Sequence, residues 1–227
     1  MTSVLLVVVV SVLLIVAGLK KLPDIGILAV LLIIGLTLWR RGESITTLGF
    51  DPPQNWGATI LLGLVFGIAL QLVGVAIIEP LSERITQEPH DLTIVENIRG
   101  NWKAFVQWLL LVWIFVPVLE EGIYRGFLMT ETANIIGTGP TALIVNVLFS
   151  SLVFGLSHGY QGRSGILSTT LVGIPLGIIF IWSGFNLWLP IFTHGFIDTV
   201  GLAMIAVDGD KVIQRKIWGT HDPSQGD

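Results

Sequence analysis

The chain lacks cysteine and carries few charges. None of its 227 residues is cysteine, and only 12% are Asp, Glu, Lys or Arg. The absence of cysteine excludes disulfides, thiol nucleophiles and zinc bound by thiolates. The charged fraction is about half of that in a typical soluble domain, and no basic stripe suggests that nucleic acid is a partner. The composition therefore argues against a soluble domain.

Apolar residues dominate the sequence, with 52% hydrophobic residues and a mean hydropathy of +0.81. About seven segments approach the length of roughly 20 residues that spans a bilayer. They cover about 3–19, 24–39, 56–78, 104–127, 141–158, 165–182 and 187–206. Irregular backbone cannot face lipid, so we expect an all-α, polytopic transmembrane helical bundle with about seven spanning helices. Lys20 and Lys21 follow the first segment and no basic residue precedes it, so we interpret it as a retained anchor helix.

The chain shows no internal repeat and is interpreted as one domain with three parts. Residues 1–100 hold N-terminal membrane helices and a polar loop. Residues 101–210 form a core of four helices, and 211–227 are a polar tail. The polar residues that interrupt apolar segments all lie in the core, so we look for function there.

The first interruption is a charged group, Glu120, Glu121 and Arg125, after the apolar run from Phe105 to Leu119. A bilayer tolerates ionisable side chains poorly, and those at depth usually pair and often have a function. Residues four apart share a helix face, so Glu121 and Arg125 can pair. Glu120 points to another sector and stays free to accept a proton. The alternative is a structural charge cluster at a helix end.

Two later apolar segments carry histidine. His158 ends one of them, with Phe154 four residues earlier on the same face. His194 and Asp198 are also four apart, so the carboxylate could hold the imidazole in one tautomer, or both could face a shared ligand. The structural alternatives are an interface histidine and a hydrogen-bonded tie between helices.

Together these segments resemble a known family. The strings EEGIYRGF, FGLSHG and HGFID occur in that order within residues 104–206. They are similar to the three motifs of the CPBP group of intramembrane endopeptidases, where Asn or Asp is usual at the last position of the third. That group includes the type II CAAX prenyl endopeptidases and bacterial proteins linked to bacteriocin self-immunity.

The resemblance implies a role for each motif residue. The implied catalytic residues are Glu120, His158, His194 and Asp198, and the implied supporting residues are Glu121, Arg125 and Phe154. In this scheme Glu120 activates water as a general base, helped by His158. The pair on the last helix stabilises the oxyanion of the tetrahedral intermediate. Residues 101–210 would then be the catalytic core.

Two mechanisms stay open at this point. Catalytic zinc usually takes three protein ligands, and Glu120, His158 and His194 could supply them, although the chain has no His-Glu-x-x-His motif. The alternative is metal-free, with Glu120 and a histidine acting on water and hydrogen-bond donors placed at the developing oxyanion. We favour the glutamate mechanism and keep zinc open as a cofactor.

We therefore expect an integral protein of the lipid bilayer, in a prokaryotic cell membrane, that hydrolyses a peptide bond of a peptide or protein substrate at the membrane. One rival is a non-enzymatic adaptor or immunity protein that binds a peptide or partner. A second is a proton-coupled transporter, since carboxylates and histidines also form relays. Transporter folds often contain internal repeats, which this sequence lacks.

Overall fold

The structure is a computed structural model that describes residues 2–218. The described residues contain helices and no strand. In chain order the elements are α1 (Ser3–Leu19), α2 (Pro23–Arg41), η1 (Ile45–Leu48), α3 (Trp56–Val73), η2 (Gly74–Ile78), α4 (Glu79–Thr86), η3 (Thr93–Ile98), α5 (Trp102–Ile114), α6 (Val116–Glu121), η4 (Gly122–Met129), α7 (Thr130–Ile136), α8 (Pro140–Ser157), η5 (Gly159–Gln161), α9 (Gly162–Trp182), α10 (Trp188–Ala206) and α11 (Gly209–Trp218).

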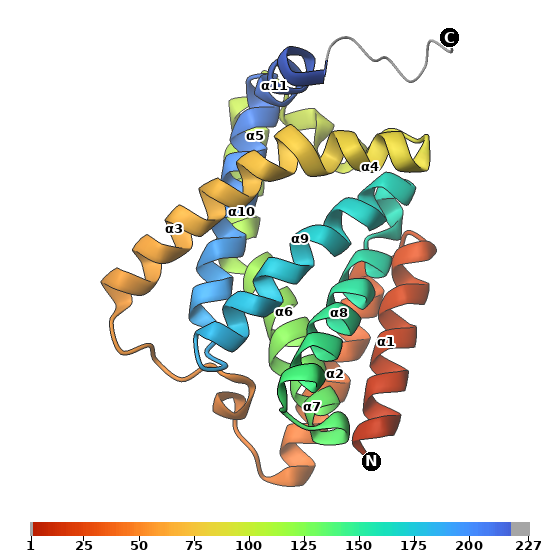
Figure 1. Ribbon diagram of the computed structural model, residues 1–227, viewed down its shortest axis with the longest axis vertical. Helices are drawn as coiled ribbons and strands as arrows, with labels where there is room; N and C mark the ends of the chain where they lie inside the picture. The colour runs from red at the N-terminus through yellow and green to blue at the C-terminus, as the bar shows by residue number, and fades with distance from the viewer. Residues whose placement is uncertain (1, 219–227) are drawn as a thin grey trace.

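The predicted all-α, polytopic bundle is confirmed. Six helical stretches within the described residues are long and apolar enough to cross a membrane, and α1 is a shorter apolar helix of 17 residues. Many large apolar side chains are exposed on them, for example Leu28 and Leu32 of α2. In a bilayer these side chains would contact lipid. Figure 1 shows the helices gathered into one bundle, with α4 and α11 at the end opposite to α7.

Two helical stretches are longer than the sequence predicts. The third runs from Trp56 to Thr86, and the fourth from Trp102 to Ile136, whereas the apolar segments predict ends near residues 78 and 127. Both continue through a π-helical segment, η2 in the third and η4 in the fourth. They end only where the backbone turns left-handed, at Gln87 and Gly137. Hydropathy marks where the apolar run stops, and the helices continue into more polar sequence.

The fourth stretch is broken just before the charged group. Phe115 leaves helical geometry, with φ −126° and ψ −55°, and Pro117 lies in the first turn of α6. Proline has no backbone N–H and is tolerated at a helix start. The short helix α6 therefore begins anew and ends at Glu121, where the wider turns of η4 begin.

Helix α10 packs closely against α3 through two glycines. A Cβ atom at Gly63 would lie 2.5 Å from the Cβ of Phe192, and one at Gly67 would lie 2.5 Å from the Cβ of Phe196. Small residues spaced four apart let membrane helices approach at backbone distance. This contact fixes the position of α10, which carries His194.

The N-terminal helix supports the end of α8 in a similar way. Gly18 of α1 faces the backbone carbonyl of Ser157, and an added Cβ there would overlap that carbonyl. The backbone of Leu19 lies against Gly159. The turn that carries His158 is therefore held from outside the predicted core.

We expect Gly18→Ala to destabilise the protein by about 1–3 kcal/mol, because a methyl group forced into a packed contact displaces backbone. Gly35→Ala is the matched control, since Gly35 lies in α2 and nothing is within 4 Å of an added Cβ. Alanine should there be neutral or slightly stabilising. Thermal unfolding in detergent, followed by circular dichroism, compares the two variants. Equal midpoint temperatures of unfolding for the two variants would show that α1 does not pack closely against α8.

The first part of the predicted polar tail, 211–227, is helical. Residues up to Trp218 belong to α11, and the rest of that tail lies outside the described residues. Arg99 Nη2 contacts Asp210 Oδ2 at 2.7 Å, and Trp218 Nε1 donates to the carbonyl of Ala76 at 2.7 Å. The helix is short and polar, so periodicity gives little signal. Contacts with residues far away in the sequence hold it in place.

Candidate active site

The three polar interruptions meet inside the bundle. Glu120 comes from the end of α6, His158 follows α8, and His194 lies in α10. His158 Nε2 is 3.9 Å from Glu120 Oε1, and His194 Nε2 is 3.7 Å from Glu120 Oε2. These separations exceed a direct hydrogen bond. The Glu120 carboxylate thus lies between two imidazoles, with one oxygen facing each.

Glu121 and Arg125 form the predicted ion pair. Arg125 Nη1 donates to Glu121 Oε1 at 3.0 Å, and both side chains are fully buried. Arg125 Nη2 also donates to the carbonyl of Gly173 in α9 at 3.0 Å. Its guanidinium carbon lies 4.7 Å from the centre of the Phe154 ring. Arg125 therefore joins α6, α8 and α9 at the floor of the site.

Glu121 also binds His194, a contact that the sequence does not predict. His194 Nδ1 lies 2.7 Å from Glu121 Oε1. An ionised carboxylate only accepts hydrogen bonds, so Nδ1 is the donor and Nε2 is turned towards Glu120. The two residues are 73 positions apart, so no spacing rule could reveal the contact.

The spacing of His194 and Asp198 suggests two roles for Asp198, and one of them is to hold the imidazole of His194. In the structure Asp198 does not make that contact. Its Oδ2 is 3.7 Å from His194 Nε2, too far for a direct hydrogen bond. Glu121 rather than Asp198 therefore orients the imidazole. Asp198 is 25% exposed in its side chain, and it faces the same cavity as His194. This geometry favours the other role, in which the His–Asp pair faces a shared ligand.

His158 is oriented by backbone and by an aromatic ring. Its Nδ1 lies 2.8 Å from the carbonyl oxygen of Phe154, which can only accept, so Nε2 faces Glu120. The Phe154 ring packs edge-on against His158, with centroids 4.7 Å apart. Tyr124 donates to Ser157 Oγ at 2.6 Å and fixes the neighbouring turn. Phe154 thus packs between His158 and Arg125.

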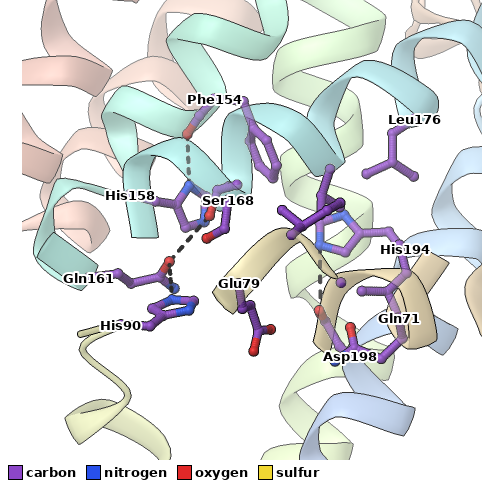
Figure 2. Close-up of a pocket in the computed structure, with 15 residues that line it drawn as sticks. Gln71, Glu79, His90, Phe154, His158, Gln161, Ser168, Leu176, His194 and Asp198 are labelled. Atoms are coloured by element: carbon purple, nitrogen blue, oxygen red, sulfur yellow. Dashed lines mark hydrogen bonds and ion pairs between the residues drawn. The ribbon is translucent and has the colours of Figure 1, made fainter. Parts of the chain in front are cut away.

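A cavity of about 180 Å³ opens beside these residues. Figure 2 shows His158 on one wall and His194 with Asp198 on the other. Such a volume holds several waters, since a single water needs only about 10–15 Å³ by this measure. Six further polar side chains line it: Gln71, Glu79, His90, Gln161, Ser168 and Thr169. They lie outside the three motifs, and only the fold brings them to the cavity.

The site residues as they stand do not fit a zinc ion. Within residues 2–218, no group of three or more His, Asp or Glu side chains is arranged to hold a metal ion. The carboxylate oxygens of Glu120 lie 3.9 Å from His158 Nε2 and 3.7 Å from His194 Nε2. Two ligands about 2.0–2.2 Å from a tetrahedral zinc would lie closer together. The side chains would have to move inwards to bind zinc.

Comparison with known proteins gives two matches. Residues 102–200 match the family model described as "Type II CAAX prenyl endopeptidase Rce1-like". Over 160 residues, 63% of this chain, the sequence is 26% identical to CAAX prenyl protease 2 of Saccharomyces cerevisiae. The match covers 47% of that relative, so the chain spans about half of its length. No solved structure matches.

The match to the family model includes the residues of the site, from Glu120 to Asp198, and the apolar helices agree with an integral membrane protein. The predicted resemblance is thereby confirmed: residues 102–200 are similar to Rce1-like type II CAAX prenyl endopeptidases.

Proposed function

We propose that this protein is an intramembrane endopeptidase in which Glu120 activates water for attack on a peptide bond. The observation that carries the proposal is the Glu120 carboxylate. Both of its oxygens face imidazoles, and within residues 2–218 no Lys or Arg pairs with it. The arginine nearest in sequence is engaged with Glu121 instead. The family supports a protease, and this geometry supports a glutamate base.

In the first step Glu120 accepts a proton from water as the water oxygen bonds to the carbonyl carbon of the substrate. His158 Nε2 faces Glu120 Oε1 and can hold the same water molecule by a hydrogen bond. Both side chains are mostly buried, with exposed fractions of 13% and 12%. General-base catalysis of this kind contributes about 10²–10⁴-fold to a rate.

The second requirement is a donor for the oxyanion. His194 Nε2 is directed towards the reacting region because its Nδ1 is held by Glu121. A fixed donor aimed at the developing charge is worth about 10²–10³-fold in acyl transfer. Asp198 Oδ2 lies 3.7 Å from His194 Nε2 and can balance the charge of the imidazole when both of its nitrogens carry protons. Collapse of the tetrahedral intermediate breaks the carbon–nitrogen bond, and Glu120 returns its proton to the leaving amine.

We infer that the substrate is a membrane-associated peptide segment, because the site lies on apolar helices. The relative in yeast is named for a prenylated substrate. A panel of peptides with and without a prenyl group on the same sequence tests whether that preference extends to this protein.

We expect the purified protein to cleave at least one peptide of such a panel, with cleavage unchanged by a chelator. His158→Ala should reduce the rate by about 10²-fold or more, since a positioned acid–base group is lost. Mass spectrometry of the products, with and without EDTA or phenanthroline, provides the measurement. Loss of activity on chelation and recovery with added zinc would replace the glutamate mechanism by a metal mechanism.

A further inference from the structure

We propose that Glu79 is a specificity-determining residue that binds the positively charged side chain of a Lys or Arg in the substrate. This inference rests on the proposed peptidase function and adds a substrate preference to it. One wall of the cavity carries polar residues that lie outside the three motifs. Figure 2 shows Glu79 between His90 on one side and the His194–Asp198 pair on the other.

Glu79 is a carboxylate without a cationic partner at the wall of the cavity. It begins α4, directly after the π-helical segment η2, and it lines the cavity. Its Oε2 accepts a hydrogen bond from Gln214 Nε2 at 3.2 Å. Within residues 2–218, no Lys, Arg or His lies within ion-pair distance of it. Glu79 belongs to the candidate spanning stretch Trp56–Thr86, and an ionisable residue in such a stretch is a candidate for function by default.

The C-terminal helix holds Glu79 in this orientation. Gln214 belongs to α11, which is anchored at its start by Arg99 to Asp210 and at its end by Trp218 to the carbonyl of Ala76. Both contacts are short, at 2.7 Å. The hydrogen bond from Gln214 therefore comes from a fixed element. It leaves the other carboxylate oxygen of Glu79 available to a ligand.

The charge around the cavity favours a cation. Asp198 lies 3.7 Å from the His194 imidazole, which can balance its charge, whereas Glu79 has no such neighbour, and none of the described side chains that line the cavity is Lys or Arg. Burial lowers the pKa of His90, against a smaller opposing effect of its hydrogen bond to Gln161, so this imidazole is neutral at neutral pH. Charge complementarity sets specificity in such clefts. An ammonium or guanidinium group is attracted here, and an anionic group is repelled.

The test compares peptides that differ at one position, carrying Lys, Arg, Gln or Glu, with that position moved along both sides of the cleaved bond. We expect kcat/KM for the best Lys or Arg peptide to exceed that of its Gln counterpart about tenfold, which corresponds to about 1.4 kcal/mol. Glu79→Gln should bring this ratio close to one, because the carboxylate that distinguishes the Lys or Arg peptide from the Gln peptide is removed. N-acetylated and free versions separate a side-chain cation from the terminal amine.

Glu96→Gln is the matched control, because it removes one acidic charge at an exposed position that does not line the cavity. It should keep the full preference. Gln214→Leu should weaken the preference without abolishing it. Equal cleavage of Lys and Gln peptides by the unaltered protein, or an unchanged preference in Glu79→Gln, would overturn the inference while the peptidase function stands.

Binding gives a second readout that does not depend on turnover. The Glu120→Gln variant should bind the Lys peptide more tightly than the Gln peptide, and a further Glu79→Gln change should remove the difference. Fluorescence anisotropy with labelled peptides measures both. Equal binding of the two peptides to Glu120→Gln would contradict the assignment of Glu79. If the unaltered protein binds peptides and cleaves none, the peptidase function fails instead.

Discussion

The Glu120→Gln variant is expected to lose cleavage by about 10²–10⁴-fold in kcat while it keeps its fold and binds peptide. Gln has nearly the same size as Glu but cannot accept a proton from water, so only the general-base step is removed. The carboxylate has no ion pair with Lys or Arg among the described residues. Its replacement should therefore leave no buried cation without a partner. Single-turnover cleavage in detergent, with thermal unfolding of the same sample, measures both properties.

The choice of control decides how this result is interpreted. Glu96→Gln again removes one carboxylate, at an exposed site, and should retain full activity. If Glu120→Gln cleaves as fast as the unaltered protein, the proposed mechanism is wrong. If the unaltered protein and Glu120→Gln both bind the same peptide and neither cleaves it, the non-enzymatic alternative gains support. Recognition of the peptide would then not need the base.

Arg125→Met is expected to destabilise the protein by about 3–5 kcal/mol, more than Gly18→Ala. Breaking a buried pair leaves an uncompensated charge, which costs far more than the pair contributes. Glu121 would lose its arginine while fully buried and would keep only the hydrogen bond from His194 Nδ1. The carbonyl of Gly173 would also lose its donor. Thermal unfolding in a fixed detergent compares the variant with the unaltered protein.

A double variant separates the lost pair from the lost packing. Glu121→Gln together with Arg125→Met removes both charges, so it should recover a large part of the stability lost in the single variant. Arg125→Lys should recover less, because one ammonium group cannot reproduce the fork that reaches both Glu121 and Gly173. Single and double variants of equal stability would show that Glu121 is protonated or hydrated rather than charged.

Much of this arrangement could be predicted from local spacing. The pairing of Glu121 with Arg125 follows from a separation of four residues and is present in the structure. Long apolar runs located the spanning helices, because hydrophobic length is a strong signal in a membrane protein. The meeting of the three polar groups, by contrast, was expected chiefly because their motifs resemble those of a family.

Other features could not be predicted because they depend on contacts between distant residues. The hydrogen bond from His194 to Glu121 joins residues 73 positions apart. Glu79 and His90 come from a polar stretch that precedes the core, and the bend at η2 and the following loop bring them to the cavity. The close contact between Gly18 and Ser157 likewise cannot be predicted from a single sequence, because glycine in an apolar helix has many explanations.

The π-helical segment η4 has a consequence for how many residues this part of the chain must contain. It spans eight residues, Gly122–Met129, all buried, and follows directly after the two glutamates. A π-helical segment holds about one residue more than an α-helix with the same overall rotation. If all eight residues closed to 3.6 residues per turn, one flank would rotate by about 100° relative to the other, and the carboxylates would no longer point at the imidazoles. Loss of one residue together with that closure would keep the flanks in place, so the segment tolerates the loss of one residue better than the gain of one.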